Sequence, residues 1–375
     1  MLTKTPYYKT MKNFTLKTIG AAAILIFTAN LKANAQGCVA IKGTGGLMTI
    51  EHPMEDSTGS EQSWEITASF RYFKSFRHFK GSEEQKQRLI IGNEVINHQS
   101  TYDLFLTRNF DRFWSVSIGV PYLINTRSSL YEHGGKERHK SYSNGFGDTR
   151  IMASRWLFDS HKTTKGNIQV GLGIKLPTGD ADYMSNFYNV IPSKRPVDQS
   201  IQLGDGGVGI IAQFNGFLNF NSHFSGYTNL YYLSNPRNTN NTRTYRETLS
   251  ATLANEAISS VPDQYLARLG VNYTFGGALR ALTLSAGGRI EGIPVHDVFG
   301  KSDAFRRPGY IISVEPSVNY AFKRFNVFAS VPIAVRRDRT QSVTDKENSA
   351  IQGKYVIGDA AFADYAVNFG VSFKF

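Results

Sequence analysis

The chain has 375 residues, enough for two soluble domains or for one large β-barrel. Of its 42 lysines and arginines, five lie in residues 1–35, which hold no acid, so the rest of the chain has 37 basic against 30 acidic residues. Because these charges are dispersed, nucleic acid is excluded as the expected partner, and the single cysteine, Cys38, excludes an internal disulfide framework.

The first 35 residues have the features of a secretory signal peptide. Lysines precede an apolar run at residues 19–29, and Ala33-Asn34-Ala35 matches the small-residue pattern of a cleavage site. We expect cleavage after Ala35, with Met11 as an alternative to Met1 as the first residue. Beyond residue 35 no continuous apolar run of 18 residues occurs, so the sequence predicts no transmembrane helix.

Residues 36–62 are rich in glycine and polar residues, and we expect them to form a periplasmic segment that leads into the fold. Cys38 follows the expected cleavage site closely, so it is either an inert thiol or a lipid-bearing first residue. Residues 35–37 lack the leucine that usually precedes a lipid-bearing cysteine, which favours the inert thiol.

From residue 63 onwards, apolar and polar residues alternate with a period of two, which predicts β-strands with two unlike faces. Turns and polar loops separate these runs. About twelve strands are expected, at residues 63–73, 96–108, 112–123, 147–158, 167–177, 207–220, 224–233, 264–275, 281–291, 309–322, 325–336 and 363–375.

The last of these strands, ADYAVNFGVSFKF, has the most regular pattern. One face is small and polar, and the other is apolar, with Ala363, Tyr365, Val367, Phe369, Val371, Phe373 and Phe375. It resembles the terminal strand of bacterial outer-membrane β-barrels, which commonly ends in an aromatic residue. That resemblance implies recognition by the barrel-assembly machinery through the strand that ends at Phe375.

Connection lengths alternate along the chain. Short connections follow the even-numbered strands, and long polar ones, such as residues 125–146, follow the odd-numbered strands. An even strand count with short periplasmic turns and long external loops is typical of outer-membrane barrels. In hydrocarbon every backbone N–H and C=O must be paired, so the sheet must close. We therefore expect an all-β, closed, antiparallel, up-and-down transmembrane barrel over residues 63–375, in contact with the lipid of the bacterial outer membrane.

Prolines support this orientation, because proline lacks the N–H that a sheet needs and belongs at a strand end or a bulge. Five prolines are expected near the external rim: Pro121, Pro177, Pro236, Pro294 and Pro332. Pro316 lies inside an expected strand and therefore predicts a bulge there.

Three stretches resemble the outer-membrane family named after the MetA pathway of phenol degradation. They are Gly119-Val120-Pro121-Tyr122-Leu123, Gly145-Phe146-Gly147-Asp148-Thr149-Arg150 and Gly171-Leu172-Gly173-Ile174-Lys175-Leu176-Pro177-Thr178-Gly179-Asp180. The resemblance covers residues 64–233 and is weaker afterwards. It implies an exported barrel that passes or binds small organic molecules, and it supplies no binding residues.

Patterns of residues that carry chemistry are scarce, so we expect no enzyme, cofactor or metal. The eight histidines lack the spacing of a zinc site, although His98 and Ser100 share a strand face, as a hydroxyl–imidazole pair would require. Residues 204–209 are glycine-rich, but no helix follows them, so they predict a loop entering a strand rather than a phosphate site. Asp180 and Asp182 could bind calcium, but a solvated loop is favoured.

The expected inward faces carry charges that could line a path through the barrel. The basic candidates are Lys175, Arg268, Arg289, Arg336 and Lys374. The acidic candidates are Asp103, Glu291, Glu315 and Asp364. Fewer acids than bases are clearly placed, which predicts a mild preference for anions.

Two functions of different classes remain open. One is a channel or transporter for passive or binding-assisted passage of small solutes, aromatic or anionic ones among them. The alternative is a structural or adhesive barrel with a plugged lumen that acts through its external loops. A bore of about twelve strands lies between small filled barrels and open porins, so it favours neither strongly.

Overall fold

The computed structural model describes residues 62–375 apart from residues 160–161, 164, 245–248 and 250. The described residues belong to one compact unit of the chain. The expected signal peptide and the segment 36–61 with Cys38 lie outside the described residues and stay predictions.

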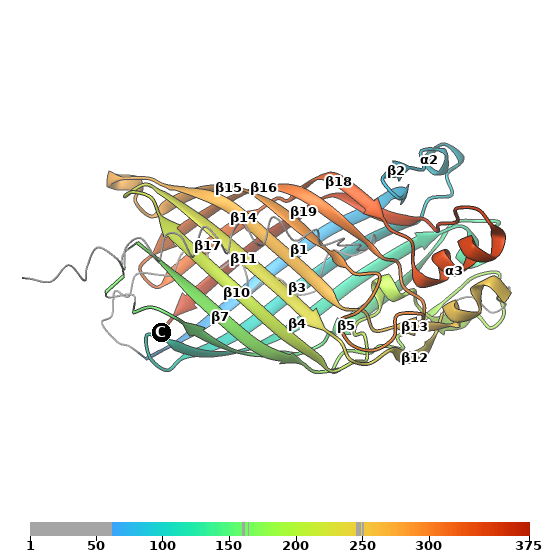
Figure 1. The fold of residues 1–375 in the computed structure, drawn as a ribbon, viewed down its shortest axis with the longest axis horizontal. Coiled ribbons are helices and arrows are strands. Elements are labelled where there is room, and N and C mark those ends of the chain that lie inside the picture. The colour runs from blue at the N-terminus through green and yellow to red at the C-terminus, as the bar shows by residue number, and fades with distance from the viewer. Residues whose placement is uncertain (1–61, 160–161, 164, 245–248, 250) are drawn as a thin grey trace, which may run out of the picture. The chain divides into compact units, whose positions relative to one another are not determined.

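A closed antiparallel barrel of 12 strands forms the fold, as the sequence predicts (Figure 1). One of its strands is broken into two parts, β17 and β18. The strands are β1 (Ser63–Lys80), β3 (Ile96–Asn109), β4 (Trp114–Ser129), β6 (Arg150–Trp156), β7 (Gly166–Lys175), β10 (Gly209–Asn219), β11 (Phe224–Ser234), β14 (Gln264–Thr274), β15 (Leu282–Ile293), β16 (Gly309–Phe322), β17 (Phe325–Ser330), β18 (Ile333–Arg339) and β19 (Ala360–Lys374).

The seam between β1 and β19 closes the barrel. Trp64 and Phe375 exchange both backbone hydrogen bonds at 2.8 Å, so the last residue of the chain completes the sheet. On the inner face of the seam, the hydroxyls of Thr67 and Ser372 are hydrogen-bonded at 2.8 Å. On the outer face, the Phe373 ring lies 4.7 Å from the Phe325 ring, measured between centroids. The two faces therefore separate as the alternation predicts.

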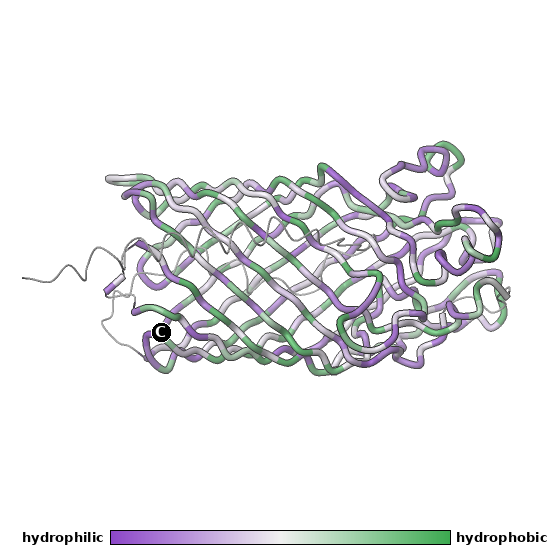
Figure 2. Tube along the Cα trace, in the orientation of Figure 1, coloured by the Kyte–Doolittle hydropathy of each residue, from purple (hydrophilic) through white to green (hydrophobic). Residues whose placement is uncertain are grey.

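Apolar side chains remain exposed around the outside of the barrel, and hydropathy alternates along its strands (Figure 2). Leu104 is 55%, Leu172 65% and Leu269 60% exposed, although they lie on β3, β7 and β14 respectively. Soluble monomers rarely expose an apolar surface of this extent. Such a surface suits the hydrocarbon core of a membrane.

Connection lengths differ between the two ends of the barrel, as the sequence predicts. Residues 110–113, 220–223 and 323–324 make short turns at the end that holds the C-terminus (Figure 1). The long loops lie at the other end and carry all the remaining elements except η5. No helix among the described residues is long and apolar enough to span a membrane.

The remaining elements are short. The strands are β2 (Glu83–Glu84), β5 (His139–Phe146), β8 (Met184–Asn186), β9 (Lys194–Pro196), β12 (Thr239–Arg243) and β13 (Ile258–Ser260). The helices are α2 (Gln87–Ile91), α3 (Val343–Gln352) and the 3-10 turns η2 (Tyr131–His133), η3 (Gln199–Ile201), η4 (Ala251–Ala257) and η5 (Gly277–Leu279).

The expected polar loop at residues 125–146 is largely a β-hairpin. β4 continues to Ser129, and β5 pairs with the C-terminal half of β4, from Tyr122↔Phe146 to Ser129↔His139. β6 pairs with the N-terminal half of β4, so β5 and β6 follow one another along the same edge of β4. The prediction of a loop was wrong because polar residues such as those of β5 also suit a strand pair that extends beyond the membrane.

The predictions for Pro121 and Pro316 were also wrong in detail. Pro121 lies inside β4, and Pro316 pairs with Ala286 without a register shift. Each carbonyl accepts a backbone N–H from a break in the neighbouring strand: Gly147 bonds Pro121 at 2.8 Å, and Val331 bonds Pro316 at 3.1 Å. The N–H and C=O of a residue in an antiparallel strand point toward the same neighbouring strand. Each proline therefore lacks its N–H on the side where the neighbouring strand is interrupted, so no regular sheet hydrogen bond is lost there.

Replacing Phe373 and Phe375 with aspartate should prevent closure of the barrel, whereas replacing both with leucine should not. Acidic groups on the lipid-facing surface are destabilising, though less so than the about 2–4 kcal/mol of basic groups at the bilayer midplane. Heat-modifiable migration on gels measures the folded fraction, since a closed barrel resists detergent until boiled. Equal folded fractions for the two variants would contradict the role of the outer face at this seam.

Candidate functional site

A belt of ionised side chains crosses the barrel interior, and we call it the charged belt. Its members are Arg71, Asp103, Arg150, Arg268, Arg289, Glu291 and Glu315, each at most 6% exposed. Buried charges are costly unless they are paired and hydrogen-bonded, so their partners decide whether the arrangement is stable.

Glu315 joins two arginines on neighbouring strands. Arg268 and Arg289 are direct cross-strand partners on β14 and β15, and like charges in that position repel. The Glu315 carboxylate lies 2.9 Å from Arg268 Nε and 3.5 Å from Arg289 Nη1. It also accepts a hydrogen bond from Ser330 at 2.8 Å. The carboxylate therefore compensates both cations.

Glu291 extends the belt to the seam strand. It lies two residues from Arg289 on the same face of β15 and accepts its Nη2–H at 2.9 Å. On the other side it accepts both hydrogen bonds from Arg71 Nη2, at 3.1 and 3.2 Å. β1 and β15 are not neighbours in the sheet, so this pair spans the lumen rather than following the wall.

Neutral side chains continue the network along the wall. Arg268 Nη1 donates to Asn229, Asn229 donates to Asn215, and Asn215 donates to Gln169, at 3.0–3.1 Å. These residues lie on the adjacent strands β14, β11, β10 and β7. Linked polar groups of this kind specify one arrangement of the lumen when each has a partner.

Asp103 faces inward from β3, as predicted, and is 4% exposed. Its Oδ1 has no hydrogen-bond partner among the described residues, and Arg150 and Arg71 supply positive charge near it. Arg150 lies in one of the stretches that resemble the phenol-degradation family, but it was not predicted among the inward charges. Arg150 lies opposite Gly119 on β4 and Lys175 on β7, and both of these residues face inward. Pairing with two inward residues was the signal that could have identified Arg150 as inward-facing.

Arg336 does not line the lumen, so its prediction was wrong. A register shift between Ile312 and Ser313 marks an irregularity in the pairing of β16 with β18. Val335 and Arg336 are consequently both exposed, and Arg337 takes the inward position. The Arg336 side chain is 55% exposed and pairs with Asp338 at 3.2 Å. A bulge changes which face a residue occupies, and alternation alone does not reveal it.

The last two inward candidates lie at opposite ends of β19. Asp364 pairs with Arg77 at 2.8 Å and with Arg337 at 2.6 Å, near the long loops. Lys374 lies opposite Glu65 at the other end of the seam. Neither belongs to the charged belt.

Lys175 occupies its predicted inward position and is 1% exposed. Its ammonium contacts Asp205 and lies 3.7 Å from Asp148. Lys175, Arg268 and Arg289 thus each have a carboxylate partner. The expected mild preference for anions stays a prediction, and these pairs argue against a strong one. The partners of Lys175 come from outside the barrel strands, so alternation could not identify them.

Three close-packed glycines, Gly147, Gly179 and Gly204, join the ends of the loop 176–208, and we call them the glycine junction. A Cβ on Gly179 would lie 2.9 Å from backbone atoms of both Gly147 and Gly204. The Asp148 carboxylate accepts the N–H of Gly179 at 3.0 Å and that of Asp205 at 3.1 Å. Two of these glycines belong to the stretches that resemble the phenol-degradation family, although their role could not be read from sequence.

Between these joined ends, the loop 176–208 lies across the mouth of the barrel. Its 3-10 turn η3 packs against β4, and Ile201 is fully buried. The Ile201 carbonyl accepts hydrogen bonds from Ser143 and, at 3.3 Å, from Asn125. On the far side, Gln199 donates to the carbonyl of Ser260 at 2.8 Å. The loop is therefore held from opposite walls.

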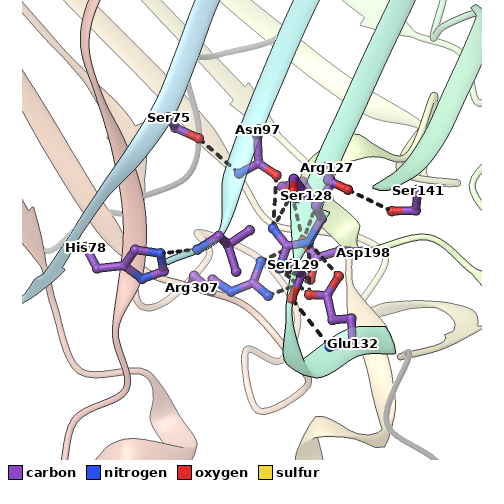
Figure 3. A network of polar contacts seen from close by, with 12 residues as sticks. Ser75, His78, Asn97, Arg127, Ser128, Ser129, Glu132, Ser141, Asp198 and Arg307 are labelled. Carbon is purple, nitrogen blue, oxygen red and sulfur yellow. Dashed lines mark hydrogen bonds and ion pairs between the residues drawn. The ribbon is translucent and has the colours of Figure 1, made fainter. Parts of the chain in front are cut away.

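Arg127, Glu132, Asp198 and Arg307 form a mouth cluster that anchors this loop (Figure 3). Arg307 donates two hydrogen bonds to Asp198, at 2.9 and 2.5 Å, and Arg127 lies 3.5 Å from it. Arg127 also pairs with Glu132 at 2.6 Å. Burial alone would raise the pKa of Asp198, but the two guanidinium groups outweigh burial and hold that pKa far below its ordinary value.

A cavity of about 70 Å³ separates the loop from the charged belt. Its lining includes Gln99, Arg150, Gln264 and Leu203, which come from the strands and the loop. An apolar cavity of roughly 150 Å³ accommodates benzene, so this space is too small for an aromatic ring. Solutes of that size could pass only if the loop moved.

His98 and Ser100 do not form a reactive pair. His98 Nδ1 is hydrogen-bonded to the Tyr72 hydroxyl at 2.8 Å, and both side chains are partly exposed. The aspartates considered for calcium are used in a turn, where Asp180 accepts the N–H of Asp182 at 2.9 Å. Among the described residues no group of His, Cys, Asp and Glu is arranged to bind a metal.

Searches with models of known protein families, and against curated proteins, find no match to this chain. Among solved structures, an outer membrane channel from Pseudomonas putida F1 matches with a TM-score of 0.53 and 9% identity, over 86% of this chain and 99% of that chain. The Pseudomonas putida toluene transporter TodX matches with a TM-score of 0.39 and 9% identity, over 91% and 96%. The translocator domain of the Neisseria meningitidis autotransporter NalP gives 0.39 and 10%, over 85% and 90%.

The first of these similarities is strong enough to show a shared fold. Its low identity shows no more than that. The fold is accordingly that of an outer-membrane β-barrel, and the residues of the charged belt and the mouth cluster must be interpreted from their own geometry.

Replacing Glu315 with glutamine should destabilise the barrel, because Arg268 and Arg289 would keep their buried charges without this carboxylate. Loss of one partner from a buried ion pair costs about 3–5 kcal/mol, while replacing both partners is often neutral. The double variant Glu315→Gln with Arg268→Met should therefore recover at least half of the lost stability. Urea unfolding in detergent, followed by tryptophan fluorescence, measures both. A single variant as stable as the wild type would contradict the role of Glu315.

Proposed function

We propose that this chain forms a channel in the bacterial outer membrane for small polar solutes, closed at rest by the loop 176–208. The observation that carries the proposal is the mouth cluster, in which one loop carboxylate, Asp198, is held by arginines from two other parts of the chain. A single anchored loop across a polar lumen has the features of a gate.

The polar interior supports passage rather than storage of an apolar ligand. Ser115, Ser117 and Gly171 face inward from β4 and β7 and are too small to fill a bore of this width. Because the charges of the belt are largely paired, strong selectivity for anions is not expected. Once the loop has moved, the open channel should therefore admit neutral and weakly charged solutes.

The remaining parts of this proposal concern targeting. An exported chain, a closing strand that ends at Phe375 and an apolar outer face together suit assembly into the outer membrane, with the long loops outside the cell. The stretches that contain Gly147 and Gly179 resemble the phenol-degradation family, and this resemblance implies that the solutes are small organic molecules. Aromatic solutes would require the loop to move, given the size of the cavity.

A structural barrel with a plugged lumen is the second candidate. Two observations favour it: the charged belt spans the lumen, and the cavity beneath the loop holds only about 70 Å³. In that case the loop would never leave the mouth, and loosening its anchor would not open a path.

Replacing Asp198 with asparagine should raise conductance in a planar bilayer. The substitution removes the anion that Arg127 and Arg307 share, and a loss of about 2 kcal/mol would shift the ratio of closed to open channels by a factor of up to about 30. Arg336→Met is the matched control, because it removes another ion pair from the exposed outer surface. Current like that of the wild type from a folded Asp198→Asn barrel would favour the structural barrel.

The wild-type channel should stay closed between about pH 8 and about pH 5. A carboxyl whose pKa is lowered in the folded state stabilises that state at any pH above its ordinary pKa of about 3.9. This stability is lost only when the pH falls through the lower pKa of the folded state. His133 nearby stays neutral over the same range, because burial lowers its pKa to about 4. Bilayer conductance recorded across this range checks the expectation. Opening within it would show that Asp198 is not the group that holds the loop.

A further inference from the structure

The cavity between the loop 176–208 and the charged belt is lined by polar atoms that have no protein partner. Gln99 Nε2, Gln264 Oε1 and Ser260 Oγ are all buried and lack a hydrogen bond within the described part of the chain. The three residues are 3%, 8% and 1% exposed. A buried polar atom without a partner is costly, so such a group marks a place for water or a polar ligand.

Some other amides in the lumen are hydrogen-bonded to one another. Asn229, Asn215 and Gln169 bond one another in a continuous chain. Asn272 Oδ1, Asn319 Nδ2 and Asn326 Oδ1 also lack a partner among the described residues, but these three residues do not line the cavity. Gln99 and Gln264 lie on β3 and β14, which are not neighbours in the sheet, and each approaches the cavity from its own wall.

Charge does not dominate the cavity. Lys175 pairs with Asp148 and Asp205, and Arg307 pairs with Asp198. Arg150, the other cation of the lining, belongs to the charged belt. Apolar side chains, including Leu123, Leu233 and Ile293, complete the walls. A neutral ligand that combines a polar group with a short hydrocarbon part suits this lining better than an ion does.

We propose that this cavity is a binding site for a hydroxyl group of a small neutral alcohol or polyol. A hydroxyl can donate to Gln264 or accept from Gln99, and a diol can do both with separate hydroxyls, whereas a carboxylate has no proton for Gln264. The volume of about 70 Å³ limits the bound part to a few non-hydrogen atoms. The inference rests on the proposed function, because a solute that crosses the lumen would meet this site directly beneath the loop.

Saturation-transfer NMR on the folded barrel in detergent tests the site, with propane-1,2-diol as the probe and propionate as the acid of similar size. The diol signal should exceed the propionate signal in the wild type. It should fall about fivefold in Gln99→Leu and in Gln264→Leu, as expected for the loss of one hydrogen bond. Gln213→Leu is the matched control, since Gln213 lies on β10 of the lumen wall but does not line the cavity.

Each outcome decides the proposal. Equal diol signals in the wild type and both cavity variants, or a propionate signal as strong as the diol signal, would overturn it. Because the comparison of the two probes uses the wild type alone, it remains decisive if a variant fails to fold. Swelling of liposomes that contain the Asp198→Asn barrel, in propane-1,2-diol, tests the channel separately. Diol binding to the wild type without swelling of the Asp198→Asn liposomes would keep the site and reject the channel.

Discussion

Closure of β1 on β19 is the constraint on which the rest of this structure depends. A sheet whose outer face lies in hydrocarbon cannot leave a row of backbone N–H and C=O groups unpaired. The chain meets this requirement to its final residue, since Phe375 exchanges backbone hydrogen bonds with Trp64. The two prolines inside strands obey the same rule, because each directs its missing donor toward a break in the neighbouring strand.

Closure also decides which residues must share the interior. Once the outer face is apolar, alternation places every second residue in the lumen, including charges that have no partner on their own strand. Their partners are instead supplied across the bore, as Glu291 and Arg71 show at 3.1 Å. The charged belt is thus a consequence of barrel geometry, and it links strands that are not neighbours in the sheet.

Sequence predicted what depends on local periodicity and missed what depends on distant contacts. The strands, their closure and the inward positions of Asp103, Lys175, Arg268, Arg289, Glu291 and Glu315 follow from alternation, and the structure places them so. Arg336 was misplaced by the irregularity in β18, which leaves no clear sign in composition. The pairing of Lys175 with Asp148 and Asp205 depends on how the glycine junction brings the loop ends together, and no periodic pattern contains that information.

The lumen is held by two groups of ion pairs with different consequences for movement. The charged belt joins residues of the barrel strands, which backbone hydrogen bonds hold along both edges, so its pairs can separate only if the wall deforms. In the mouth cluster, Arg127 of β4 and Arg307 of another loop both contact Asp198. Asp198 itself belongs to the loop 176–208, whose ends are held by the glycine junction. Loss of the Asp198 contacts would therefore loosen the middle of the loop, which Ile201 and Gln199 also hold, while its ends stayed in place. If this barrel conducts, the opening movement must occur at the mouth cluster, and the charged belt must select among the solutes that enter.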